Sequence, residues 1–276
     1  MFAPVKDYPA ILYRGDQRKT LIISDIHLGW EMNLARKGVH VPSQAPRMLH
    51  KLLKLIDKTK PSALTILGDV KHTIAKAEPG EWRDIPEFFE SLLAEVDDVQ
   101  IVRGNHDGNL EPLLPPPIQL HSSTGMTLNT IGLFHGHTWP AEKLLACDTL
   151  LMGHVHPVVA FEDTLGFRIT APVWIKAKCD VKKLAAIYVK RKRIKMQSSP
   201  RVAFKQHFGV SPKVKELLIM PCFNDFLGGP PVNRKRKSRR YIGPVLGSKA
   251  ININSAEIYL LDGTFLGAIR QLATSR

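Results

Sequence analysis

Five short motifs built from Asp, Asn and His each follow an apolar run in this sequence. They are Asp25-Ile26-His27, Gly68-Asp69, Gly104-Asn105-His106-Asp107, His135-Gly136-His137 and Gly153-His154-Val155-His156. Apolar runs of this length, bounded by polar or Gly-containing turns, predict buried strands. Ligands of open α/β sheets bind in the crevice at the carboxyl ends of strands. We therefore expect the five motifs to meet there and to form a metal centre.

The number and kind of donors indicate two ions. Two carboxylates, one amide oxygen and four or five imidazoles exceed the four ligands of a tetrahedral ion. Mixed imidazole and oxygen ligands favour Mn, Fe, Zn or Ni over Ca or Mg. Two ions roughly 3.5–4 Å apart can clamp the attacking and leaving oxygens of an in-line phosphoryl displacement, and a bridging water becomes a hydroxide nucleophile. The donors thus predict metal-dependent phosphoester hydrolysis.

Local spacing predicts how the donors are aimed. Residues i and i+2 of an extended strand share a face, so Asp25 with His27, and His154 with His156, can each converge. His106 is placed to give a proton to the leaving alkoxide. Asp107 is expected to hold the His106 imidazole in its charged form.

Taken in order, the five motifs resemble those of the calcineurin-like metallophosphoesterases, over roughly the first two-thirds of the chain. The resemblance implies an α/β fold, a four-layer α/β/β/α sandwich of two mixed sheets, with a dinuclear metal site at the strand carboxyl ends. It implies that Asp69 bridges two divalent ions, for which we expect Mn²⁺ ahead of Fe, Zn or Ni. One ion would take Asp25, His27, Asp69 and His156, and the other Asp69, Asn105, His135 and His154, while His106 acts on the leaving group.

Further motifs resemble a smaller branch, the SbcD/Mre11-related phosphoesterases of archaea and the bacterial ligase-associated phosphoesterases. These motifs are Ser24–Glu31, Ala171–Trp174, and Pro221–Asn224 with Gly228-Gly229. In that branch the final third returns toward the site. We therefore expect a core of residues 1–178 and an extension of residues 179–276 that completes the second sheet within the same structural domain. The DNA-binding cap and helical arms of true Mre11 nucleases are missing.

Composition narrows the class of protein. With 276 residues and 44% hydrophobic content, the chain can bury a large core. No apolar stretch has membrane-spanning length and no signal pattern is present, so we expect a cytoplasmic protein without a membrane partner. The three isolated cysteines argue against a disulfide framework or zinc finger. The net charge of +14 favours a polyanionic partner such as DNA or RNA, although it also serves solubility.

Hydrophobic periodicity predicts the elements around the motifs. Residues 48–56 and 85–96 have helical spacing, and each precedes an apolar run, as in a parallel sheet with helical crossovers. Residues 167–175 are predicted to form a strand, and residues 184–195 a basic edge strand with one solvent-exposed face. Residues 257–261 and 265–269, joined by Asp262-Gly263, predict a hairpin.

Residues beside the motifs are candidates for substrate contact. These are His137, His72, and Arg234 and Arg236 of the basic run 234–240, which is also typical of a solvated loop. We favour a phosphodiester substrate in a nucleic acid or nucleotide. The alternatives are a phosphomonoesterase of the same fold and a non-catalytic nucleic-acid-binding protein with a vestigial metal site, which would require a broken motif. Thr138-Trp139 after His135-Gly136-His137 exclude the H-x-H-x-D-H motif of metallo-β-lactamase-type hydrolases.

Overall fold

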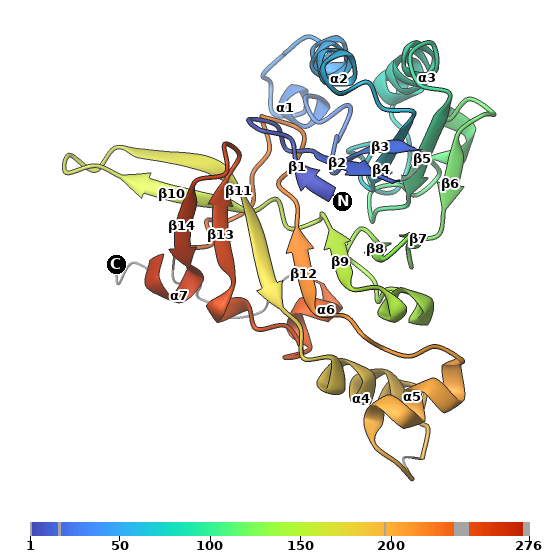
Figure 1. The fold of residues 1–276 in the computed structure, drawn as a ribbon. Helices are drawn as coiled ribbons and strands as arrows, with labels where there is room; N and C mark the ends of the chain where they lie inside the picture. Colours follow the sequence, from blue (N-terminus) through green and yellow to red (C-terminus); the bar gives the residue numbers. More distant parts are fainter. Residues whose placement is uncertain (1, 16–17, 196, 235–242, 273–276) are drawn as a thin grey trace.

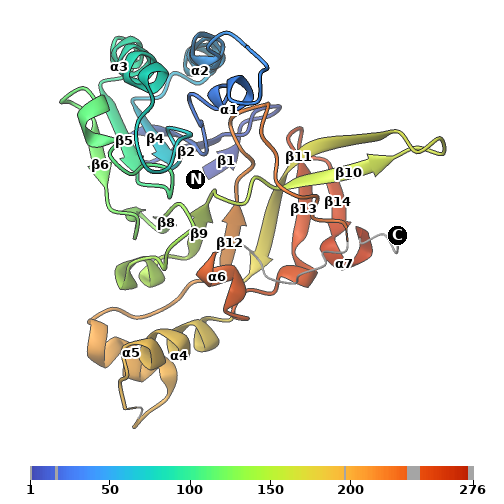
Figure 2. The ribbon, with the colours of Figure 1, turned by 180° about the vertical axis from the view of Figure 1, so that it is seen from behind.

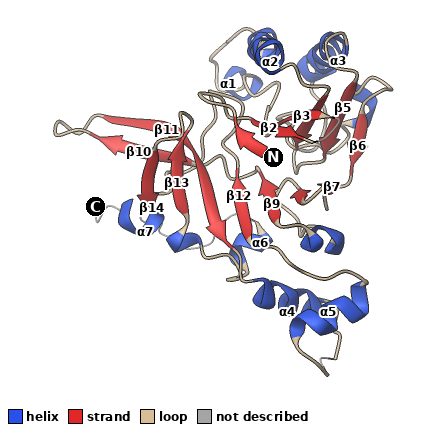
Figure 3. Ribbon diagram, in the orientation of Figure 1, coloured by secondary structure: helices blue, strands red, loops and turns tan. Residues whose placement is uncertain are grey.

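A computed structural model describes residues 2–15, 18–195, 197–234 and 243–272. Two mixed β-sheets form its centre, and helices lie on both sides of the pair (Figure 1 and Figure 3). This is the expected α/β/β/α sandwich.

The first sheet has the order β1-β2-β3-β4-β5-β6, and β3 to β6 are parallel. Its strands are β1 (Phe2–Pro4), β2 (Ile11–Arg14), β3 (Lys19–Ile23), β4 (Ala63–Leu67), β5 (Asp98–Val102) and β6 (Gln119–His121). The crossovers contain α2 (Ala45–Thr59) and α3 (Pro79–Leu93), and two short helices also lie in this half, α1 (Met32–Ala35) and η1 (Glu111–Leu113).

Both long crossover helices confirm the helices that the hydrophobic periodicity predicts. Helix α2 buries Met48, Leu52 and Ile56 at helical spacing and ends at Lys60, whose backbone is left-handed. Helix α3 begins six residues before the predicted start at residue 85. Pro79 occupies its first turn and a capping box joins Glu78 to Glu81, so the polar first turns are helical as well.

The second sheet has the order β14-β13-β11-β12-β9-β8-β7, with β10 pairing β11. Its strands are β7 (Met126–Leu128), β8 (Ile131–Leu133), β9 (Thr149–Met152), β10 (Val158–Glu162), β11 (Arg168–Lys178), β12 (Glu216–Ile219), β13 (Glu257–Leu260) and β14 (Phe265–Ala268). Strand β12 lies between β9, to which it is parallel, and β11, to which it is antiparallel. The predicted hairpin near the end of the chain is present as β13 and β14. The β10–β11 hairpin extends away from the body of the molecule (Figure 2).

The prediction of an edge strand over residues 184–195 is wrong, because residues Val181–Arg191 form helix α4. Asp180 caps the helix by accepting a hydrogen bond from the Lys183 backbone. Leu184, Ala185, Tyr188 and Val189 are buried at helical spacing, and the basic residues lie on the opposite, exposed face. The remaining short elements are η2 (Glu142–Ala146), α5 (Pro200–Phe208), α6 (Pro244–Gly247), η3 (Ile253–Ser255) and α7 (Ile269–Leu272).

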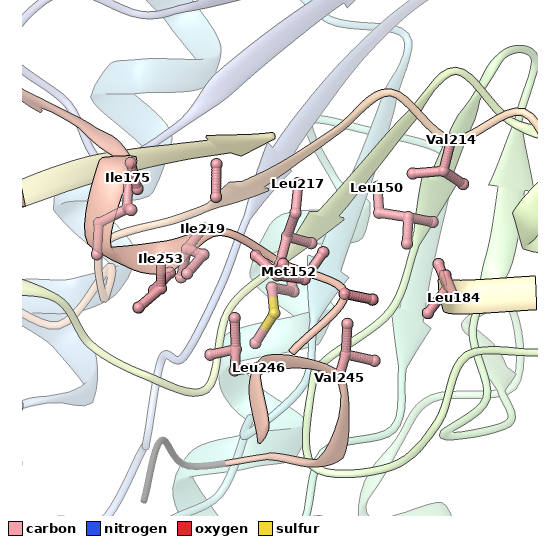
Figure 4. Packing of buried hydrophobic residues seen from close by; sticks show 14 of the residues in the cluster. Leu150, Met152, Ile175, Leu184, Val214, Leu217, Ile219, Val245, Leu246 and Ile253 are labelled. Atoms are coloured by element: carbon pink, nitrogen blue, oxygen red, sulfur yellow. The ribbon is translucent and has the colours of Figure 1, made fainter. Parts of the chain in front are cut away.

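Three hydrophobic clusters correspond to the three interfaces between the four layers. Leu21 and Ile23 pack with α2 and α3, whereas Ile22 between them packs against the second sheet. In the same way Leu151 faces the first sheet, while Leu150 and Met152 face the helices on the far side. Figure 4 shows this outer cluster, with Met152 close to Val245 and Leu246 of α6.

The three cysteines are free. Among the described residues, no helix has both the length and the apolar character needed to cross a bilayer.

Candidate metal centre

The structure brings the five motifs together. They follow β3, β4 and β5 of the first sheet and β8 and β9 of the second, so each of the stacked sheets contributes donors. Three groups of potential ligands form among the described residues. Asp69 belongs to two of them, and the third consists of His27, His72 and His106.

The Asp25 group consists of Asp25, His27, Asp69 and His156. One ligand atom from each of them lies within 4.8 Å of the others. The Nε2 atoms of His27 and His156 are 3.3 Å apart, and His156 Nε2 lies 3.2 Å from Asp25 Oδ1. His27 Nε2 lies 3.6 Å from Asp69 Oδ2. These four residues are the set expected for one ion.

The His135 group consists of Asp69, Asn105, His135 and His154. His135 Nε2 is its centre, at 3.2 Å from Asp69 Oδ2, from Asn105 Oδ1 and from His154 Nδ1. The other ring nitrogen, Nδ1, donates a hydrogen bond to the Leu67 carbonyl oxygen at 2.8 Å. This bond fixes the ring and leaves Nε2 free for a metal, as is common for histidine ligands.

The spacing of the donors fits cations. Ligand atoms about 2.0–2.1 Å from a tetrahedral ion lie about 3.3–3.4 Å from one another. The separations of 3.2–3.6 Å in the two groups match this value. Imidazole nitrogens and carboxylate oxygens together suit Mn, Fe, Zn or Ni.

The donors are aimed by left-handed backbone, and the prediction of extended i, i+2 pairs is wrong. Asp25, His27, Asp69, His154 and His156 have φ angles of 59°, 49°, 50°, 70° and 47°. At Asp25 and His27 the sharp turns let both donors reach the same group, with Ile26 buried between them, whereas His154 and His156, on either side of buried Val155, reach different groups. Left-handed conformations cost free energy in non-glycine residues and persist where surrounding contacts hold them.

Two glycines allow the loops to approach closely. A Cβ atom on Gly104 would lie 2.1 Å from Asp69 Oδ1, and one on Gly153 would lie 1.7 Å from Ser24 Oγ. Both motifs therefore need glycine before their donors.

Electrostatic interactions divide the four imidazoles into two kinds. Burial opposes the charged form of His156 and His135, but Asp25 raises the pKa of His156 to about 11 and Asp69 raises that of His135 to about 9. Burial lowers the pKa of His27 to about 3 and that of His154 to about 4. Each group therefore has one protonated and one neutral ring before a metal binds.

His106 lies beside the Asp25 group, with its ring centroid 4.8 Å from that of His27. Its Nδ1 donates a hydrogen bond to the His72 carbonyl oxygen. Asp107 instead accepts hydrogen bonds from the backbone of Gly104 and Val70, so the expectation that Asp107 holds the His106 ring is wrong here. Burial raises the pKa of Asp107 to about 6, and its hydrogen bonds fix the loop that carries Asn105 and His106.

The other candidates occupy different places. His72 lies at the site, with Nδ1 3.4 Å from His27 Nδ1. The His137 ring centroid is 5.3 Å from that of His135, and its buried Nδ1 has no hydrogen-bond partner within the described structure. Arg234 forms an ion pair with Glu162 on β10, and Arg236 lies outside the described residues.

Several residues that hold the Asp25 loop were not predicted as site residues. The Ser24 hydroxyl donates to Asp25 Oδ2, and the Cys222 thiol donates to the Asp25 carbonyl oxygen. Asn224 Nδ2 donates to the Ile26 carbonyl oxygen at 2.9 Å. The only signal in the sequence was that Ser24 and residues 221–224 lie in motifs that resemble a known branch, because isolated Ser, Cys and Asn residues carry no spacing pattern.

Comparison with known proteins adds the following findings. Residues 18–172 match the family model described as calcineurin-like phosphoesterase. The structure is similar to a nuclease, MPE, of Pseudomonas putida, with a TM-score of 0.48 and 18% identity over 95% of this chain and 98% of that one. It is also similar to Yfce, a phosphoesterase from E. coli, with a TM-score of 0.33 and 23% identity over 52% of this chain and 73% of that one. No curated protein matches.

Proposed function

Because the chain belongs to the calcineurin-like phosphoesterase family, we propose that it hydrolyses phosphodiester bonds of a nucleic acid or nucleotide with two divalent ions, Mn²⁺ foremost. The observation that carries this proposal is the convergence of seven donors into two groups that share Asp69. The Asp25 group would hold one ion and the His135 group the other.

Two ions bound there would activate a water molecule and neutralise the charge that develops on the phosphoryl oxygens. His106 is the residue that we propose to protonate the leaving oxygen. Its Nδ1 is committed to the His72 carbonyl oxygen, so Nε2 is the nitrogen that exchanges a proton with the substrate. The neutral rings of His72 and His137, whose pKa values burial lowers to about 4, can contact the phosphate as hydrogen-bond donors.

The preference for a diester is supported by the net charge of +14, which favours a polyanionic substrate over a small monoester. The proposed relation to the SbcD/Mre11 branch is supported by Ser24–Glu31 and 221–224, which also contact each other, as Phe223 N donates to the Ser24 carbonyl oxygen at 2.8 Å. We also propose that residues 1–178 and 179–276 form one structural domain, because β12 pairs with both β9 and β11.

The first test is the effect of His106→Ala on bis-p-nitrophenyl phosphate. We expect metal-stripped protein to be inactive and Mn²⁺ to restore turnover. His106→Ala should lower turnover about 10²–10⁴-fold, the usual contribution of a general acid, and still bind two ions.

His207→Ala, on the exposed surface of α5, is the matched control and should keep wild-type turnover. Full activity of stripped protein in excess chelator would refute metal dependence. Higher turnover of p-nitrophenyl phosphate than of the diester would refute the diester preference.

A further inference from the structure

We propose that the exposed face of α2 binds the phosphate backbone of a single polynucleotide strand that extends from the metal centre, an inference that rests on the proposed function. Arg47, Lys51, Lys54 and Lys58 recur at intervals of three or four residues along this helix. Residues with this spacing share a helix face, so the four cations form one line, the basic stripe. Because α2 connects the parallel strands β3 and β4, its first turns lie at the sheet edge that carries the donors.

Most of the charge on the basic stripe is uncompensated. Arg47, Lys54 and Lys58 are exposed, and none has an acidic partner among the residues that the structure describes. Lys51 is half-buried and bonds to the Phe223 carbonyl oxygen at 2.7 Å and to Asp225 at 2.5 Å. Three cations thus remain free to contact phosphates.

Aromatic rings hold two of these three cations in place. The Arg47 guanidinium lies 4.7 Å from the centroid of Phe226, and Lys58 Nζ lies 5.0 Å from that of Tyr8. Cation–π contacts of this length are attractive, and they reduce the side-chain freedom that a ligand would otherwise have to remove. Two of the three free cations of the stripe are therefore partly ordered before binding.

A hollow of about 220 Å³ opens beside the stripe, lined by Arg47, His50, Lys54 and Phe226 among others. Pockets that enclose a whole small ligand usually measure about 300–1,000 Å³. The hollow is therefore too small for a complete nucleotide but can seat part of one unit in a longer chain. Its size favours a polymer that passes across the surface.

The stripe is joined to the loop that carries the first two donors. The ring of Phe226 stacks on Trp30 with centroids 4.9 Å apart, and Trp30 lies three residues after His27. Asn224, two residues before Phe226, donates to the Ile26 carbonyl oxygen. A strand bound at the metal centre can therefore continue over Trp30 and Phe226 onto α2.

A membrane surface suits this face less well. An interfacial helix pairs its basic residues with large apolar side chains that enter the lipid. Helix α2 itself has no exposed large apolar residue, and Phe226 beside it is 43% exposed, whereas the three most exposed such residues of the described chain, Leu165, Phe167 and Ile169, lie around the tip of the β10–β11 hairpin. The chemistry of α2 therefore points to a phosphate backbone in water.

The test compares two triple variants of the full chain. One is Arg47→Gln/Lys54→Gln/Lys58→Gln, which spares Lys51. The matched control is Lys182→Gln/Lys190→Gln/Lys205→Gln, which removes three exposed charges from α4 and α5, at the opposite end of the molecule from α2 (Figure 1). Binding of a fluorescent oligothymidylate of about 16 nucleotides is followed by anisotropy in chelator, between about 50 and 200 mM salt.

We expect the α2 variant to raise Kd about tenfold or more at low salt and to reduce the slope of log K against log salt by about 2, since each phosphate contact on a single strand contributes about 0.7. The control should keep the wild-type slope. Equal losses in both variants, an unchanged slope in the α2 variant, or no binding by wild type would each overturn the inference. It would also be overturned if the α2 variant lost binding to anionic vesicles but bound the oligothymidylate as wild type does. The anisotropy measurement contains chelator, so it reports binding without hydrolysis. A wild-type protein that binds the oligothymidylate but does not hydrolyse phosphodiesters with Mn²⁺ would refute only the proposed function.

Discussion

The Asp25 group and the His135 group hold similar donors by different means. All four residues of the Asp25 group have a left-handed backbone, with φ between 47° and 59°. His135 and Asn105 are not among the residues with positive φ, and the His135 ring is fixed by its bond to the Leu67 carbonyl oxygen. The Asp25 group is therefore positioned entirely by left-handed backbone, whereas the His135 group combines two left-handed residues, Asp69 and His154, with a ring that is fixed by a side-chain hydrogen bond.

This difference shows where the cost of building the site lies. A left-handed residue costs about 1–2 kcal/mol, so the Asp25 group requires support from other parts of the fold. The segment 222–224 supplies it through hydrogen bonds to the backbone of Ser24, Asp25 and Ile26. These hydrogen bonds offset the backbone strain in the folded protein, so the donors are in place before an ion or substrate binds.

The largest effect should follow from Asp69→Ala, because Asp69 is the one residue that the two groups share. We expect bound metal to fall from two ions to less than one and turnover to drop about 10³-fold or more. Metal content by mass spectrometry and turnover of bis-p-nitrophenyl phosphate measure both. Asn105→Ala, which removes a donor of the His135 group alone, should retain one ion. A stable second ion in Asp69→Ala would show that the groups are independent.

A smaller effect concerns protons. At neutral pH the metal-free protein carries protons on His135 and His156, whose pKa values are about 9 and about 11, while His27 and His154 are neutral. Loading both ions should release about two protons, one from each group, so metal affinity rises with pH up to about 11 and does so more steeply below about 9. Calorimetric titration with Mn²⁺ in buffers of different ionisation enthalpy counts them.

His135→Gln should release about one proton fewer than wild type, because only His156 then remains charged. Buffer-independent heats in the wild-type protein would contradict this assignment of charge.

The smallest effect tests the backbone directly. At His27, with φ of 49°, His27→Gly should be more stable than His27→Ala by about 1 kcal/mol, because glycine adopts this conformation without strain. At His135 the order should reverse, with His135→Gly less stable than His135→Ala by about 0.5–1 kcal/mol. Urea unfolding of the four metal-free variants measures the difference. The same order at both positions would remove the distinction between the groups.

The five motifs made the fold class and the gathering of donors predictable, because strand ends of stacked sheets must meet. The local geometry was not predictable. Asp25 and His27 are left-handed because hydrogen bonds from distant segments hold them, including one from His154 N to Asp25, and no spacing rule contains such contacts. Helix α4 was misread because its basic residues, spread along the run, hid the buried spacing of Leu184, Tyr188 and Val189.

The position of β12 also bears on how the polypeptide acquires its shape during synthesis. Chains emerge from the ribosome with the N-terminus first. The first sheet can pair as soon as residue 121 has emerged, whereas β9 and β11 must wait for residues 216–219 to enter between them. Until then the edges of β9 and β11 that face each other stay unpaired, a condition that favours aggregation. A ribosome that stalls after residue 121 has emerged but before residues 216–219 have emerged should therefore carry a nascent chain that is half folded and dependent on chaperones.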